Sequence, residues 1–181
     1  MRIRLVLSYL MLVLFLFMTN SSAFIQIGNG GYYHVIRSKL PFDSLPGTQT
    51  KTYWGVQGGA GYRMEVPKNW NGELVLYAHG YRGVGPDLYV SNPRIRKYFV
   101  THGFAWAASS YNKNGYNVTA GVEGTHALGK LFAKRIKKPK RTYVIGHSMG
   151  GNITGALIEQ YPDEYNGALP MCGVMGDYRL F

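Results

Sequence analysis

Residues 142–155, with the sequence TYVIGHSMGGNITG, decide the fold class. The short apolar and β-branched run at 142–146 predicts a buried strand. Residues 149–161 predict a helix. Between the two lies Gly146-His-Ser-Met-Gly150, which has the spacing G-x-S-x-G. This spacing predicts a tight strand-to-helix turn with Ser148 at its tip, because glycines stand where a Cβ atom would clash.

Strands and helices alternate on both sides of this turn. Apolar runs predict further strands, and periodic runs predict further helices. The strands are 73–79, 103–109 and 167–172, and the helices are 91–102 and 122–136. This alternation indicates a parallel sheet with right-handed crossovers. Residues 51–57 and 61–66 flank Gly58-Gly59-Ala60 and predict an antiparallel hairpin that precedes it.

The composition is that of a packed globular domain, with 181 residues, 46% hydrophobic and 16% charged. Disordered, collagen-like and coiled-coil classes are excluded. The formal net charge is +11. Residues 134–141 (KRIKKPKR) concentrate this charge, and we expect a solvated basic edge, with an anionic polymer as the alternative partner. Aromatic residues do not interleave with this run, so nucleic acid is not an expected partner.

The first 23 residues have the pattern of a signal peptide. Arg2 and Arg4 precede an apolar run at 5–18, and Ser21-Ser22-Ala23 provides small residues for cleavage. Such a run covers about 21 Å as a helix, which is shorter than the roughly 30 Å hydrocarbon layer. We therefore expect a secreted or periplasmic protein without stable membrane insertion. The expected organisation is a leader at 1–23, an irregular segment at 24–50 and one domain at 51–181.

A second turn follows the strand at 73–79, in the sequence His79-Gly-Tyr-Arg-Gly83. The backbone N–H of Tyr81 is expected to join that of Met149 in an oxyanion hole, a pair of donors for the negative charge of an acyl-transfer transition state. The alternative is that these glycines merely turn the chain. We expect His79 to orient this loop rather than to act as a base.

Together, Tyr77-Ala-His-Gly-Tyr-Arg-Gly83, Gly146-His-Ser-Met-Gly-Gly151 and the strand from Gly167 to Gly173 give the chain a resemblance to α/β-hydrolases. It resembles the N-terminal portion of a secreted bacterial branch, from about residue 51 to 177. The resemblance implies a mostly parallel sheet that begins with an antiparallel strand and has helices on both faces. It also implies that Tyr81 and Ser148 meet at the carboxyl ends of adjacent strands, and that Ser148 cleaves carboxylic esters through an acyl-enzyme.

The chain departs from this family after the turn. Family members carry an acid and then a histidine beyond the nucleophile, but no histidine follows Ser148 here. Asp163 and Glu164 are expected at the surface, and Asp177 is the candidate acid. The simplest account is truncation, with the C-terminal strands and the base missing and this portion inactive alone. A serine peptidase of the same fold and a non-catalytic domain that binds acyl or aromatic ligands remain the alternatives.

Other side chains give weaker expectations. Tyr111 and Tyr116 follow the strand at 103–109 and either line an acyl or aryl pocket or pack within their own loop. The single cysteine, Cys172, is expected as a buried small side chain. No spacing supports a metal site or a phosphate loop, so no cofactor is expected.

Overall fold

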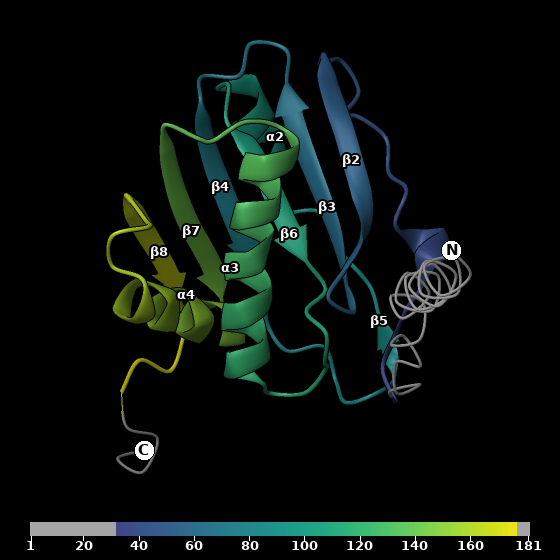
Figure 1. The fold of residues 1–181 in the computed structure, drawn as a ribbon, viewed down its shortest axis with the longest axis vertical. Coiled ribbons are helices and arrows are strands. Elements are labelled where there is room, and N and C mark those ends of the chain that lie inside the picture. Colours follow the sequence, from purple (N-terminus) through teal and green to yellow (C-terminus); the bar gives the residue numbers. More distant parts are fainter. Residues whose placement is uncertain (1–31, 177–181) are drawn as a thin grey trace, which may run out of the picture. The chain divides into compact units, whose positions relative to one another are not determined.

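The structure is a computed structural model and describes residues 32–176. A six-stranded sheet lies at the centre of this range. The chain divides into two units, Met1–Tyr32 and Tyr33–Phe181, and the account below concerns the second. The predicted leader and Asp177 lie outside the described residues. The order of the strands is β2-β3-β6-β4-β7-β8 (Figure 1). They are β2 (Thr50–Gln57), β3 (Ala60–Pro67), β4 (Glu73–Ala78), β6 (Ala105–Ser109), β7 (Arg141–His147) and β8 (Gly167–Met171).

The sheet is mixed and mostly parallel, as the sequence predicted. β2 and β3 form the antiparallel hairpin, and β3 also runs antiparallel to β6. β6, β4, β7 and β8 are parallel, so their carboxyl ends point to one edge of the sheet (Figure 1). β4 lies between β6 and β7, and Leu76 pairs with Ala107 on one side and with Val144 on the other. The turns after β4 and β7 therefore lie side by side.

Helices cover both faces of the sheet (Figure 1). Because side chains alternate along a strand, Leu74 and Leu76 face one core and Val75 faces the other. α3 (Val118–Arg135) and α4 (Met149–Gln160) cover the first core, and α2 (Arg96–Thr101) covers the second. On α3, a Cβ at Gly121 would overlap the side chain of Ile153, so the missing side chain lets α3 and α4 approach closely.

Two helices begin at other residues than predicted. α2 begins at Arg96 rather than 91, because Asn92 precedes a proline, which disfavours helix, and its Oδ1 accepts a hydrogen bond from Arg63 at 2.8 Å. α3 begins at Val118 rather than 122, because the Asn117 side chain accepts the Ala120 N–H at 2.9 Å and caps the helix.

The segment before β2 is folded onto the sheet. β1 (His34–Val35) pairs in parallel with β5 (Asp87–Leu88), and a short 3-10 helix, η1 (Arg37–Lys39), follows. Leu40 lies in the second core. The sequence predicted an irregular segment here, since a two-residue strand leaves no periodic signal.

A buried carboxylate connects α2 to the sheet. The Glu65 side chain is fully buried on β3 and accepts hydrogen bonds from Arg96 Nε at 2.5 Å, Thr50 Oγ1 at 2.7 Å and Trp106 Nε1 at 2.8 Å. Burial alone would raise the pKa of Glu65. The donated hydrogen bonds and the Arg96 charge outweigh burial and hold the pKa below its usual range.

The end of the described chain corrects one expectation. Cys172, expected to be buried, is exposed and has φ 54°. It follows β8, which pairs only with β7 in the described part of the chain and whose Leu169 is also exposed. Cys172 is exposed because it lies at the edge of the sheet, and the type of residue does not indicate such a position. Asp163 and Glu164 are exposed, as expected.

Candidate active site

Ser148 lies at the turn between β7 and α4, at the carboxyl edge of the sheet. The residue is exposed, and its backbone has φ 55° and ψ −130°. A positive φ is rare for a residue with a Cβ atom and costs of order 1–3 kcal/mol, so the surrounding structure must hold it. The predicted strand-turn-helix geometry is therefore present, with the hydroxyl-bearing residue at the surface.

Two glycines make this turn sterically feasible. A Cβ at Gly146 would overlap the backbone of Gly150 and lie 2.8 Å from the carbonyl oxygen of Ala78. A Cβ at Gly150 would overlap that same carbonyl. Their φ values are ordinary, so the requirement is for space rather than for a special conformation. The end of β4 thus packs against the turn that carries Ser148.

Backbone hydrogen bonds hold Ser148 in position. Its N–H donates to the carbonyl oxygen of Met171 on β8 at 2.9 Å. Its own carbonyl accepts from Gly151 at 2.8 Å and from Asn152 at 3.3 Å, which starts α4. Met149 is the first residue of α4, where a backbone N–H has no acceptor in a preceding turn, so we expect this N–H to face a developing negative charge.

The second predicted turn lies against the first. A Cβ at Gly80 would lie 3.3 Å from the Cβ of Ser148 and 3.1 Å from the carbonyl oxygen of His147. Tyr81 follows Gly80 and is 53% exposed, so this residue lies at the surface next to the turn that contacts Ser148. Sequence and structure thus agree on the neighbourhood of these two turns, and the donor roles of Tyr81 and Met149 stay predictions.

His79 is buried behind this turn. Its Nδ1 lies 2.6 Å from the Gly80 carbonyl, and its ring stacks on Tyr111 at 3.9 Å between centroids. Burial lowers the pKa of His79 to about 3, and the nearby Arg82 charge acts in the same direction. The imidazole is therefore neutral near pH 7. This placement fits a residue that fixes the loop.

The two candidate pocket tyrosines lie in different surroundings. Tyr111 is 1% exposed, has φ 58°, and donates its hydroxyl proton to the His79 carbonyl at 3.1 Å. Its placement fits the alternative in which the loop packs its own tyrosines. Tyr116 is exposed, and its hydroxyl lies 3.4 Å from Nδ2 of Asn152, one turn into α4. Of these two tyrosines, only Tyr116 presents its ring at the surface, and its role in a substrate pocket stays a prediction.

One polar pair beside the turn was not predicted. The Tyr77 hydroxyl lies 3.0 Å from Nδ1 of His147, and the two rings stack at 6.0 Å. This leaves Nε2 of His147 on the side of Gly80, whose Cβ position lies 3.6 Å away. Burial raises the pKa of Tyr77, so its hydroxyl stays protonated. No local pattern in the sequence marks this pair, because only the pairing of β4 with β7 brings the two residues together.

The described residues do not complete a catalytic triad. Within 32–176, no hydrogen bond joins the Ser148 hydroxyl to a histidine, and Asp177 lies outside this range. No group of three or more His, Cys, Asp or Glu side chains in that range is arranged to hold a metal ion. Nor does that range contain a helix long and apolar enough to cross a membrane.

Comparisons with known proteins give structural matches. Neither a protein-family model nor a curated protein matches this sequence. Among solved structures, an acetyl xylan esterase from Aspergillus awamori matches with a TM-score of 0.51 and 17% identity, over 65% of this chain and 50% of that one. The chain therefore spans half the length of this esterase.

Two peptidase structures match about as well. A putative dipeptidyl aminopeptidase IV from Bacteroides ovatus has a TM-score of 0.51 and 17% identity, over 67% of this chain and 21% of that one. A structure from a study of two prolyl endopeptidases has a TM-score of 0.52 and 18% identity, over 70% of this chain and 21% of that one. Identity at this level speaks to fold alone. Over about two thirds of its length, this chain has the fold of the α/β-hydrolases, which it shares with esterases and serine peptidases.

Proposed function

We propose that this chain is the nucleophile-bearing portion of a secreted serine hydrolase that cleaves carboxylic esters through an acyl-enzyme on Ser148. The observation that carries the proposal is the backbone of Ser148, exposed and strained at φ 55° between β7 and α4. Strain of this kind persists only where surrounding contacts enforce it, and it concentrates at functional sites.

The proposed chemistry uses the two turns together. The Ser148 oxygen attacks the ester carbonyl carbon while its proton passes to a general base. The carbonyl oxygen becomes an oxyanion, which the N–H groups of Tyr81 and Met149 stabilise. Loss of one such donor typically costs about 3 kcal/mol of transition-state stabilisation. The intermediate expels the alcohol, and water then releases the acid from the acyl-enzyme.

The general base is the part of this chemistry that no described residue supplies. The histidines of the chain are His34, His79, His102, His126 and His147, and none follows Ser148. We therefore propose that this portion, expressed alone, turns over p-nitrophenyl esters very slowly. Ser148-dependent turnover at an ordinary enzymatic rate would contradict this part of the proposal.

Labelling with a fluorophosphonate, carried out on a protein that also contains the general base, tests the nucleophile directly, because the reagent phosphonylates activated serines. We expect intact-mass analysis to find one adduct and peptide mapping to locate it at Ser148. The adduct should be absent from Ser148→Ala. It should still form in the control Ser38→Ala, which removes an exposed serine from the segment before β2. Labelling that survives Ser148→Ala would contradict the proposal.

The same reagents separate the alternatives. The peptidase structures that share the fold support a serine peptidase as the second candidate. A peptidase would also label at Ser148, and a matched pair of ester and amide substrates tested on a protein that contains the base would distinguish it. A non-catalytic domain for acyl or aromatic ligands would leave Ser148 unlabelled.

We also propose export through the signal peptide at 1–23. In this case the secreted protein begins at Phe24. N-terminal sequencing of the exported product checks it, and an intact Met1 on that product would contradict the cleavage.

A further inference from the structure

Lysines gather at the amino ends of the parallel strands, at the edge of the sheet opposite to Ser148. Six exposed lysines form this basic edge, which are Lys68, Lys130, Lys134, Lys137, Lys138 and Lys140. They come from the loop between β3 and β4, the end of α3 and the loop between α3 and β7, and these segments meet at the top of Figure 1. The N–H of Lys140 donates to the Gly72 carbonyl at 2.7 Å, which joins the two loops. The fold thus brings together charges from separate segments of the chain.

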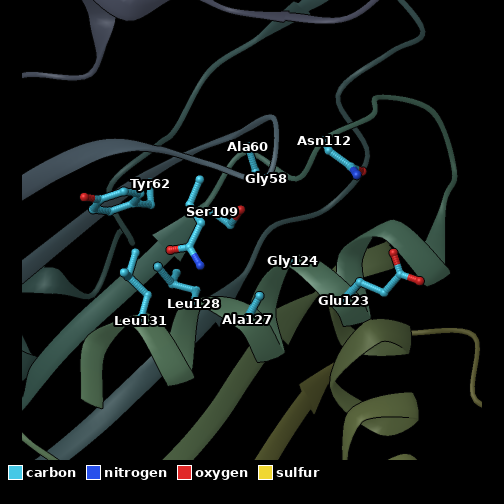
Figure 2. Close-up of a pocket in the computed structure, with 11 residues that line it drawn as sticks. Gly58, Ala60, Tyr62, Ser109, Asn112, Glu123, Gly124, Ala127, Leu128 and Leu131 are labelled. Carbon is cyan, nitrogen blue, oxygen red and sulfur yellow. The ribbon is translucent and has the colours of Figure 1, made fainter. Parts of the chain in front are cut away.

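The end of α3 presents its lysines to solvent because its other side packs on the sheet. Figure 2 shows Leu131 of α3 beside Tyr62 of β3, and Leu128 belongs to the core on this side of the sheet. Lys130 and Lys134 are four residues apart, so their Cβ atoms lie about 6 Å from each other on one helix face. Both side chains are exposed, so this face carries two cations side by side.

The lysines of the basic edge lack anionic partners within the described part of the chain. In residues 32–176, no lysine forms an ion pair with a carboxylate. The arginines beside them are already engaged, since Arg141 donates to Glu73 at 3.1 Å and Arg135 donates to the Tyr62 hydroxyl. Unpaired charges of one sign raise the local electrostatic potential, which attracts anions of high charge.

A hollow of about 480 Å³ lies within the basic edge, between α3, the start of β7 and the loop before β8. Its charged lining consists of four cations and two carboxylates, which are Lys130, Lys138, Lys140, Arg141, Asp163 and Glu164. The cations thus predominate even where the edge also contains acidic side chains. Because the lysines are exposed, a negatively charged group reaches their ammonium groups from the surface.

The basic edge lacks the exposed apolar side chains with which proteins bind membranes and nucleic acids. No large hydrophobic residue is exposed in residues 68–72 or 130–141. A protein that inserts into a membrane interface uses exposed aromatic and aliphatic side chains, and one that binds single-stranded nucleic acid stacks bases on aromatic rings. Trp70 in the β3–β4 loop is occupied, because its ring packs edge-on against Phe132 and its Nε1 donates to the Glu73 carbonyl at 2.8 Å. A polyanion without bases or acyl chains fits this surface better.

We propose that the basic edge binds an acidic polysaccharide, a chain of sugars that each carry a carboxylate. The carboxylates pair with the lysine ammonium groups and displace small counterions. Lysine suits such a polymer because its flexible stem and compact charge adapt to carboxylates at uneven spacing, whereas the fork of arginine requires a fixed geometry. Because the basic edge lies at the other end of the strands from Ser148, a bound polymer leaves the candidate active site open.

Isothermal titration calorimetry on the full chain tests the proposal with an oligogalacturonate and with a neutral dextran of the same length. We expect an oligogalacturonate of about ten sugars to bind with a dissociation constant on the order of 10 µM in about 50 mM NaCl. The dextran should not bind measurably. The affinity for oligogalacturonate should fall as the NaCl concentration rises, because each pair formed releases a counterion. Equal affinity for the two polymers would overturn the proposal.

Two double variants locate the binding. Lys134→Gln/Lys138→Gln removes two charges from the basic edge, and Lys39→Gln/Lys113→Gln removes two exposed charges from elsewhere, so the net charge falls equally. The first should weaken binding at least about fivefold and reduce the slope of log affinity against log salt concentration by about 1.4. The second should weaken binding less than about twofold. Equal losses in the two variants would overturn the proposal, and circular dichroism checks that both are folded.

Further measurements separate this site from other sites and partners. Ser148→Ala should bind oligogalacturonate as the unaltered chain does, whatever the outcome of labelling at Ser148. Loss of binding in this variant would place the polymer at the candidate active site and overturn the proposal. Oligothymidylate of equal charge and vesicles of phosphatidylcholine with phosphatidylglycerol should bind no more tightly than oligogalacturonate. Tighter binding of either, abolished in Lys134→Gln/Lys138→Gln, would assign the basic edge to nucleic acid or to a membrane and likewise overturn the proposal.

Discussion

The backbone N–H of Ser148 donates a hydrogen bond to the carbonyl oxygen of Met171 at 2.9 Å, so the turn is anchored to the neighbouring strand β8. Its other face contacts the end of β4 through Gly146 and Gly150. Contacts with two strands, β8 and β4, thus hold the strained residue. A change to either contact should alter the conformation of Ser148.

Gly150→Ala should destabilise the protein by about 3 kcal/mol, because the new Cβ would overlap the Ala78 carbonyl, which belongs to the sheet and cannot move aside. Urea denaturation measures this. The matched control is Gly85→Ala, where a Cβ meets nothing within 4 Å and φ is not positive, so stability should stay within about 0.5 kcal/mol. Equal effects of both substitutions would contradict the described packing.

Ser148→Gly should raise the free energy of unfolding by about 1 kcal/mol, because glycine adopts φ 55° without strain. Ser148→Ala keeps the Cβ and its strain, so it should leave stability nearly unchanged. The pair separates backbone conformation from loss of the hydroxyl. A glycine variant less stable than the alanine variant would show that the residue is not strained.

Glu65→Gln should cost about 3 kcal/mol, because it leaves Arg96 next to a neutral group in a buried site. The pKa of Glu65 is lowered in the folded protein, so as pH falls the Glu65 carboxylate takes up a proton in the unfolded state before it does so in the folded state. The stabilisation is complete above the pKa of an unfolded glutamate, about 4.3, and is lost as pH falls below it. Urea titrations at several pH values should show a smaller acid-dependent loss in Glu65→Gln.

Glu73→Gln is the control for this experiment. Glu73 pairs with Arg141 at 3.1 Å at the surface, where solvent screens the pair. Its removal should change stability by no more than about 0.5 kcal/mol. If Glu73→Gln lowered the free energy of unfolding as much as Glu65→Gln does, burial would not be the reason for the cost of losing the Glu65 charge.

His79 should show no titration between pH 5 and 8, because burial lowers its pKa to about 3. NMR signals of its ring protons check this, and in concentrated urea the same histidine should titrate near pH 6.5. Because the unfolded state takes up the proton more readily, His79 contributes stability that is complete above about pH 6.5 and declines as pH falls toward 3. A folded-state midpoint near 6.5 would contradict its burial.

The central elements were predictable because their signals are local. The apolar runs before His79 and Ser148 gave β4 and β7 to within a residue or two, and the glycines at 146 and 150 predicted the turn between strand and helix. Both positions require glycine because a Cβ atom there would collide with the Ala78 carbonyl, and this contact exists only in the assembled sheet.

Other features depend on contacts that are distant in sequence. The start of α2 follows from an Arg63–Asn92 bond, and the burial of Tyr111 follows from its contact with His79. Exposure of Cys172 reflects the edge position of β8. The Tyr77–His147 pair likewise exists only because β4 and β7 are neighbours. No periodicity in the sequence reports such pairings.

The ring of Phe42 has the guanidinium groups of Arg63 and Arg96 at 5.0 and 5.3 Å from its centre, and it also contacts Trp106. A shortened gene that starts at residue 51 would delete this aromatic cap and uncover the indole beneath it. Such a product would expose an apolar patch and aggregate into inclusion bodies. A product that starts at residue 33 would retain the cap and should not aggregate in this way.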